Sequence, residues 1–191
     1  AVQDGENYKL ASIRELNEKL QYCDIVVPQK FEFYTDYFTY YEINQGTDAL
    51  LKCCDFLVKI DPTYAPYVEQ LKHCHSYHCF NMMYTSKIIL NRYCEWLFEL
   101  LFEFEKRVDI SEWSIQQKRV FGYVSECLFN LWIKHEKLTV SECNVVMTEK
   151  FPCGEESIAT EFHGLGKLSI SRLKLMAIAW PILRKNRIIF C

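Results

Sequence analysis

The chain has 191 residues, of which 50% are hydrophobic and 15% aromatic, and it contains six glycines. This length and composition fit one well-buried core and exclude a fibrous or disordered chain. The net charge of −3 hides an asymmetry, because residues 1–161 carry 16 Lys or Arg against 25 Asp or Glu, whereas residues 162–191 carry six Lys or Arg and no acidic side chain. We therefore expect an acidic main domain over residues 1–150 and a basic amphipathic tail over residues 151–191.

The N-terminal stretch AVQDGENYKL is neither basic nor apolar, so it does not resemble a signal peptide. The ten cysteines include several inside apolar, helix-like patterns, and we expect reduced thiols in a cytoplasmic protein. The apolar run LKLMAIAWPIL is interrupted by Lys174 and Pro181 and falls short of the ~20 residues that span a bilayer. The tail leaves two interpretations open: it packs against the acidic domain, or it makes a peripheral contact with the inner face of the membrane.

The first elements are predicted by a helix cap and a β-branched run. Ser12-Ile-Arg-Glu15 has the capping-box pattern, which predicts a short helix starting at about Ile13. Residues 25–27, Ile-Val-Val, form a compact β-branched run that ends at Pro28. This pattern is typical of a buried strand followed by a loop.

Helices are predicted next. Thr47 or Asp48 can cap a helix through CCDFLVKI, and Asp61-Pro62-Thr63 ends it and begins another over YAPYVEQLK. Residues 77–84 are predicted to form a strand, with Ser86 capping the helix that follows over residues 88–107. The polar residues of that helix recur every three or four positions, which predicts one solvated stripe on a helix that is otherwise buried.

The last elements complete the predicted fold class. Ser111 opens a second long helix over about residues 113–134, with its core stripe at Val120, Val124, Cys127 or Leu128, and Leu131. Residues 138–149 include CNVVM, the last predicted strand. Strands that alternate with helices predict an α/β layer architecture, helix-rich and with few strands.

The segment HCHSYHC, residues 73–79, has the residue types of a zinc site but not the usual arrangement. Structural zinc sites take their ligands as two pairs from separate segments, and this chain has no matching second pair. Cys53 and Cys54 are adjacent, so their side chains point in different directions. We therefore predict no metal ligands here and expect the segment to lead into a strand.

Three segments carry a family resemblance when taken in order: CDIVVPQK, then CFNMMYTSKIILNRYCEWLFELLFEFEKR, then QQKRVFGYVSECLFNLWIK. Over residues 11–150 the chain resembles the C-terminal part of a family of bacterial capsular and lipopolysaccharide glycosyltransferases, catalogued as domain of unknown function 4422. The resemblance implies a partial GT-A-like, Rossmann-related α/β domain. It also implies a nucleotide-sugar-dependent, galactosyltransferase-like activity on a polysaccharide or lipid-linked saccharide acceptor.

Two departures from the family pattern qualify these expectations. Family members begin with a Rossmann-like stretch that carries a histidine-tyrosine-arginine-arginine motif, and the present sequence has neither this motif nor an Asp-x-Asp. The resemblance therefore implies an N-terminally truncated chain that is inactive by itself. It predicts no cofactor from the residues present, since a divalent metal would bind through the missing N-terminal half.

Arg119 and Glu126 are the candidates for the chemistry of glycosyl transfer. The reaction needs a group that binds the leaving diphosphate and, when it inverts, a carboxylate that deprotonates the acceptor hydroxyl. The two residues are seven apart on one predicted helix and therefore share a face, with Glu126 as catalytic base and Arg119 at the donor. Gly122 between them weakens the helix, which suggests close approach of a ligand or backbone. Alternatively, both charges are solvated or paired elsewhere.

Asn81 and His78 are the other candidates for donor or acceptor binding. Asn81 interrupts the apolar stretch CFNMMY, where a buried amide needs partners such as sugar hydroxyls or neighbouring backbone groups. His78 can hydrogen-bond a hydroxyl or phosphate, although a structural histidine is the more ordinary interpretation. The sequence contains no basic patch that would predict a nucleic-acid partner.

Three functions remain open from the sequence. The first is the glycosyltransferase, and the second is a non-catalytic remnant or interaction module that binds a partner chain. The third is a zinc-binding helical module built on residues 73–79.

Overall fold

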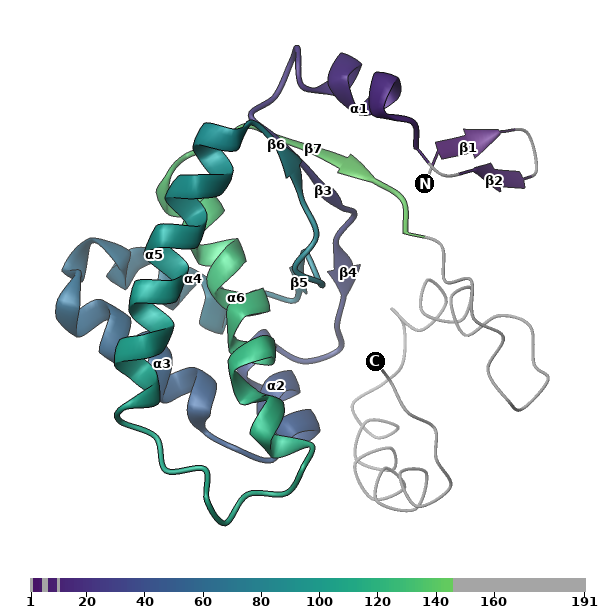
Figure 1. The fold of residues 1–191 in the computed structure, drawn as a ribbon. Helices are drawn as coiled ribbons and strands as arrows, with labels where there is room; N and C mark the ends of the chain where they lie inside the picture. The colour runs from purple at the N-terminus through teal and green to yellow at the C-terminus, as the bar shows by residue number, and fades with distance from the viewer. Residues whose placement is uncertain (1, 5–6, 10, 146–191) are drawn as a thin grey trace. The chain divides into compact units, whose positions relative to one another are not determined.

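The computed structural model describes residues 2–4, 7–9 and 11–145 (Figure 1). These residues belong to one compact unit, Ala1–Met147. The predicted amphipathic tail lies outside the described residues. Within the part described, no helix is long and apolar enough to cross a membrane.

The N-terminal region contains a short hairpin and a capped helix. Strands β1 (Val2–Asp4) and β2 (Asn7–Lys9) pair antiparallel, and helix α1 covers Ile13–Lys19. The Ser12 side chain accepts a hydrogen bond from the Glu15 N–H, and the Glu15 carboxylate accepts one from the Ser12 N–H. This reciprocal arrangement satisfies two N–H groups at the helix start, and it confirms the predicted capping box.

A three-stranded sheet has the order β6-β3-β7 (Figure 1). The central strand β3 (Ile25–Pro28) is buried along its whole length, as its β-branched run predicts. It pairs antiparallel with β6 (Tyr84–Thr85) and parallel with β7 (Val140–Cys143). A second sheet pairs β4 (Phe31–Glu32) with β5 (Ser76–Tyr77). The chain therefore returns beside the central strand twice, first at β6 and then at β7, more than a hundred residues after β3.

Helices α2 (Tyr37–Gln45), α3 (Ala49–Ile60) and α4 (Ala65–Lys72) follow, with the 3₁₀ turn η1 (Pro62–Tyr64) before α4. Asp36 caps α2 through the Thr39 N–H, and Gly46 ends it in the left-handed conformation that favours glycine. Asp61 accepts a hydrogen bond from the Thr63 N–H and so separates α3 from the next helix, as predicted.

The two longest helices are α5 (Lys87–Glu105), capped by Ser86 as predicted, and α6 (Val120–His135). Helix α6 contacts α3, α4 and α5, and Figure 1 shows it running beside α5. The predicted core stripe of α6 is confirmed, because Val120, Val124, Cys127, Leu128 and Leu131 are all buried.

Three predictions of secondary structure are wrong in detail. The predicted strand over residues 77–84 is interrupted, since β5 and β6 are separated by an irregular segment in which Phe80 has φ +69°. The predicted helix over residues 113–134 begins later, at Val120, after a 3₁₀ turn η2 (Gln117–Arg119). The last strand, β7, lies within the predicted range 138–149 but ends at Cys143, where CNVVM begins; Val146 and Met147 of that segment lie outside the described residues.

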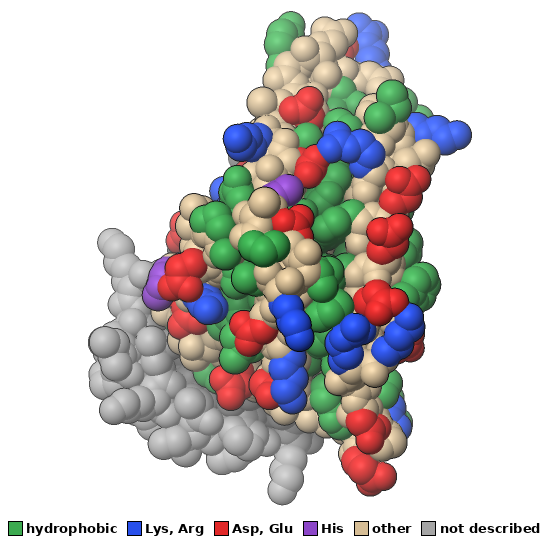
Figure 2. Space-filling model, turned by 90° about the vertical axis from the view of Figure 1, so that its left-hand side faces the viewer, with side chains coloured by type: hydrophobic (Ala, Val, Ile, Leu, Met, Phe, Trp, Pro, Cys, Tyr) green, Lys and Arg blue, Asp and Glu red, His purple; other side chains and the backbone are tan. Residues whose placement is uncertain are grey.

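Helix α5 is also less buried than predicted. Its buried side chains lie on one face, whereas Phe98 and Phe102 are 50% and 60% exposed and stack on each other with ring centroids 6.0 Å apart. On the face shown in Figure 2, hydrophobic side chains reach the surface among both basic and acidic side chains. No region of this face carries only one sign of charge. The surface of a domain of this size cannot be covered by polar atoms alone.

Candidate functional site

The candidate site lies where α6 meets the irregular segment of residues 78–81. Glu126 is half-buried on α6 and lies near the backbone of Phe80. Burial raises the pKa of Glu126 above its usual value, while the Phe80 N–H and the charge of Arg119 oppose that rise. A carboxylate with a raised pKa is the kind of group that serves as a general base near neutral pH.

Two groups that interact electrostatically with this carboxylate are neutral. Burial, followed by the charges of Cys79 and Glu126, raises the pKa of Tyr40 to about 12. Burial also raises the pKa of the Cys79 thiol to about 12, with a smaller contribution from Glu126. Both groups therefore remain uncharged at neutral pH, and neither supplies the carboxylate with a counter-charge.

Asn130 joins α6 to the irregular segment. Its Oδ1 accepts from the His78 N–H at 2.9 Å, and its Nδ2 donates to the His78 carbonyl at 2.8 Å. The same Nδ2 donates to the Glu126 carbonyl at 2.8 Å. The buried side-chain amide thus pairs with both backbone groups of His78, in the way that a neighbouring strand would.

Asn81 and Gly122 meet on the other side of Phe80. Asn81 Nδ2 donates to Ser125 Oγ at 2.7 Å, and Ser125 Oγ donates to the Gly122 carbonyl at 2.7 Å. Asn81 is exposed and does not lie in a strand, so the prediction of a buried strand amide is wrong. A Cβ built on Gly122 would have no neighbour within 4 Å, so no part of the described chain requires glycine there.

Arg119 lies at the end of η2, just before α6 begins. Its guanidinium lies over the Tyr123 ring, 5.1 Å from the ring centroid, and its side chain is exposed. The predicted placement of Arg119 within the same α-helix as Glu126 is therefore wrong by one residue. The electrostatic link between them is present, since the charge of Arg119 lowers the pKa of Glu126.

His78 is 5% exposed, and each of its ring nitrogens lies near an oxygen of the protein. Its Nδ1 lies 2.7 Å from the Pro28 carbonyl, which can only accept, so Nδ1 carries the proton. Its Nε2 lies 3.8 Å from a Glu142 carboxylate oxygen. Burial lowers the pKa of His78, while the bond to Pro28 and the charge of Glu142 oppose this. The geometry gives His78 a structural role that links β3 to the segment beside α6.

Side chains of the HCHSYHC segment have different partners. His73 Nε2 lies 3.2 Å from a Glu69 oxygen, and the Cys74 thiol donates to the Ser76 carbonyl. Across the described ranges, no group of three or more His, Cys, Asp or Glu side chains is placed to hold a metal ion. The described residues therefore do not fit a zinc site or the metal of an Asp-x-Asp type.

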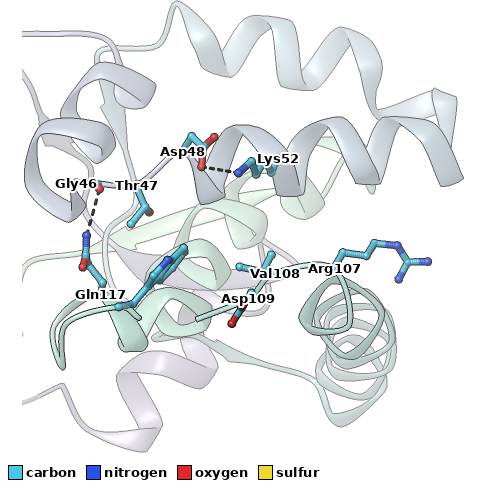
Figure 3. A pocket seen from close by; sticks show the side chains of 9 residues that line it. Gly46, Thr47, Asp48, Lys52, Arg107, Val108, Asp109 and Gln117 are labelled. Atoms are coloured by element: carbon cyan, nitrogen blue, oxygen red, sulfur yellow. Dashed lines mark hydrogen bonds and ion pairs between the residues drawn. The ribbon is translucent and has the colours of Figure 1, made fainter. Parts of the chain in front are cut away.

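A groove of about 500 Å³ lies elsewhere, between the α2–α3 loop and the chain that follows α5 (Figure 3). Most of its polar side chains are already paired. Asp48 forms an ion pair with Lys52 at 3.0 Å, and Gln117 donates to the Gly46 carbonyl at 3.2 Å. Arg107 extends away from Thr47 and Gln117, and it pairs with Glu103. This groove is a junction between segments and offers no group poised for chemistry.

The family follows from a sequence comparison. The sequence model of the family described as Domain of unknown function (DUF4422) matches residues 3–137. The chain belongs to this family. The predicted membership is thus confirmed, and the match includes α6 and residues 78–81. A search of the curated proteins found no match.

A comparison of structures gives the fold. The DUF4422 chain is similar to the apo structure of the WbbM bifunctional glycosyltransferase, with a TM-score of 0.65 and 23% sequence identity. The similarity covers 76% of this chain and 28% of that one. It confirms the predicted fold class, a partial, helix-rich, glycosyltransferase-like α/β domain.

Three residues of the site were not predicted from the sequence. Asn130 is a polar residue in the apolar stretch LFNLWI, four positions after Glu126, and this interruption is a pattern that would have indicated it. Ser125 shows no such pattern. The positive φ of Phe80 has no counterpart in the sequence, because glycine or asparagine is the usual residue at such a position.

Proposed function

We propose that this chain is part of a nucleotide-sugar-dependent glycosyltransferase that transfers galactose during the synthesis of a bacterial capsular polysaccharide or lipopolysaccharide. The fold similarity and the family membership support this proposal. The chain spans 28% of the length of the glycosyltransferase chain that it resembles, so the activity of a whole enzyme is part of the proposal.

The observation that carries the proposal is the environment of Glu126. A half-buried carboxylate with a raised pKa, whose electrostatic neighbours include a neutral phenol and a neutral thiol, has the properties of a general base. Arg119, exposed and close enough to influence that carboxylate, is available to an anionic ligand.

The reaction then follows an inverting course. The acceptor hydroxyl gives its proton to Glu126 while its oxygen forms a bond to the anomeric carbon of the donor sugar. The bond between that carbon and the nucleotide diphosphate breaks, and its electron pair leaves with the diphosphate. Arg119 stabilises the charge that develops on the leaving group.

The test is sugar transfer by the natural full-length protein. UDP-galactose, UDP-glucose and GDP-mannose are offered as donors with galactose-containing oligosaccharide acceptors, and product formation is measured. We expect transfer from UDP-galactose and a loss of ~10²- to 10⁴-fold in Glu126→Gln, because the amide keeps the shape and removes the base.

Glu99→Gln is the matched control, since Glu99 is an exposed carboxylate on α5. This variant should retain full turnover. A Glu126→Gln protein that is folded and fully active would remove Glu126 from the mechanism. Absence of transfer from all three donors by the wild-type protein would overturn the proposal in favour of a non-catalytic interaction module.

A further inference from the structure

The C-terminal end of α6 carries a histidine that contacts polar groups on both sides of its ring. His135 is the last residue of α6, and its side chain is 23% exposed. Its Nε2 lies 2.9 Å from Thr63 Oγ1 in the turn η1, and its Nδ1 lies 3.1 Å from Glu136 Oε1. Both ring nitrogens are therefore within hydrogen-bond distance of an oxygen.

The partners of Thr63 determine which atom carries the proton between Thr63 and His135. Thr63 Oγ1 lies 2.5 Å from Asp61 Oδ1, and the Thr63 N–H donates to the same oxygen at 3.0 Å. The bond from the Thr63 hydroxyl lowers the pKa of Asp61, so its carboxylate is ionised at neutral pH and can only accept. The hydroxyl proton thus points to Asp61, and Thr63 Oγ1 accepts from an N–H at Nε2 of His135.

The other ring nitrogen also has to donate. Glu136 forms an ion pair with Arg92 of α5, and its carboxylate offers Nδ1 an acceptor. Nδ1 therefore carries a second proton, and the ring is an imidazolium. This cation is hydrogen-bonded to Glu136 directly and to Asp61 through the Thr63 hydroxyl.

Two further features favour a positive charge on this ring. His135 ends a helix of 16 residues, and the helix dipole stabilises a cation in the last turn. The ring also stacks on the ring of Tyr64, with centroids 3.9 Å apart and an interplanar angle of 10°. The face of an aromatic ring is negative and attracts a cation.

We propose that His135 is held as an imidazolium that joins the end of α6 to the turn between α3 and α4, and that this contact weakens when the ring loses its proton. A neutral ring has one N–H and cannot donate to both Glu136 and Thr63. The two carboxylates also lose the positive charge between them. The contact is a pH-sensitive device in the fold, and it does not depend on the proposed sugar transfer.

Other titratable or charged groups contact the ring or its partners and influence its charge. They are Asp61 after α3, Tyr64 in η1, Tyr67 on α4, Arg92 on α5 and Glu136 after α6. The two carboxylates favour the imidazolium, whereas the positive charge of Arg92 opposes it. Burial raises the pKa of Tyr64, so its phenol stays neutral and contributes through its ring.

The test is nitrogen-15 NMR of the His135 ring at pH 7 in the natural full-length protein, for wild type, Thr63→Val and Thr63→Ser. The chemical shifts of the two ring nitrogens distinguish the imidazolium from both neutral forms. Valine keeps the shape of Thr63 and removes the hydroxyl, so we expect the ratio of imidazolium to neutral ring to fall about fivefold, the effect of one hydrogen bond. Thr63→Ser keeps the hydroxyl and should retain the wild-type ratio.

Amide hydrogen exchange measures whether the contact holds the turn. In wild type, the protection of the Tyr64 and Ala65 amides, corrected for the intrinsic effect of pH, should be about fivefold greater at pH 6 than at pH 8. In Thr63→Val it should be equal at both pH values. His73→Gln is the control for the other histidines, because the exposed His73 pairs with Glu69 of its own helix. This variant should keep the wild-type dependence on pH.

Two results would overturn the inference. One is an equal ratio of imidazolium to neutral ring in wild type and a folded Thr63→Val, and the other is protection in wild type that does not change with pH. If Thr63→Val does not fold, Glu136→Gln removes the negative charge beside Nδ1 and should also lower the ratio. Neither measurement needs transfer activity, so their outcome is separate from the test of the proposed function.

Discussion

The site beside α6 and the groove beside α3 both form where a helix meets an irregular segment, yet their polar groups are arranged differently. At α6, the amides of Asn130 and Asn81 bond to backbone or hydroxyl groups, and Glu126 forms no salt bridge within 4 Å among the described residues. In the groove, Asp48 pairs with Lys52, and Arg107 pairs with Glu103.

Burial determines how these two arrangements of polar groups affect the ability of a carboxylate to act as a base. A half-buried carboxylate without an ion-pair partner within 4 Å keeps a raised pKa and remains available to take a proton. Exposed ion pairs such as those in the groove contribute little to stability, and they leave no reactive group free. A cavity by itself is therefore a weaker indication of function in this fold than a buried charge without a close counter-ion.

The largest expected effect distinguishes two arginines, one from each region. Replacing Arg119 by lysine should lower kcat/KM for the nucleotide sugar about tenfold or more, because a charge-assisted hydrogen bond contributes about 1.5–3 kcal/mol and an ammonium cannot reproduce the guanidinium fork. Lysine can still lie over the Tyr123 ring, so folding should be retained.

Arg107→Lys, in the groove, is the control and should leave kcat/KM unchanged. Steady-state transfer assays on both variants measure the difference. Equal losses in the two variants, or none in Arg119→Lys, would remove the functional distinction between the regions.

A second prediction concerns the dependence of stability on pH, which should have opposite signs for Glu126 and Asp109. Glu126 has a raised pKa in the folded state, so its contribution to stability is present at pH values below its unfolded pKa and is lost as pH rises through the folded pKa. Asp109 accepts hydrogen bonds from Ser111 that lower its pKa, so its contribution is present above the unfolded pKa and lost as pH falls.

Urea unfolding of wild type, Glu126→Gln and Asp109→Asn between pH 3 and pH 8 measures both contributions. The free energy of unfolding of wild type minus that of Glu126→Gln should decrease as pH rises above about 4.5, the ordinary pKa of the carboxyl. The corresponding difference for Asp109→Asn should increase with pH. A flat difference for Glu126 would show that its environment does not disfavour the charged form.

The smallest effect separates the two glycines of these regions. Gly122→Ala should stabilise the protein by about 0.5–1 kcal/mol, because a Cβ there meets no atom within 4 Å and alanine is the better helix former. Gly46→Ala should destabilise it by about 1–2 kcal/mol, since Gly46 has φ +64°.

Thermal or urea denaturation measures both changes. The activity of Gly122→Ala sharpens the prediction: a more stable but less active protein would show that a ligand approaches the chain at Gly122. Destabilisation by Gly122→Ala would contradict the helical geometry of this position.

Local features of the fold were predictable from the sequence because the groups that decide them are close in the chain. Ser12 and Glu15, Ser86 and Ile89, and Asp61 and Thr63 make their cap bonds within three residues of each other, so the residue pattern specifies the helix starts. The composition of the β-branched run predicted that β3 is buried, and the periodicity of the apolar residues predicted the buried face of α6.

Only the tertiary structure decided how the candidate site is assembled. His78 meets Asn130 across 52 residues of sequence, and Asn81 meets Ser125 across 44. Side-chain amides replace strand pairing between β5 and β6, so alternating apolar residues there predicted a strand that the chain does not form. The sequence identified Glu126 as a candidate base, but its burial and its position near Phe80 depend on contacts between distant segments, which no local pattern encodes.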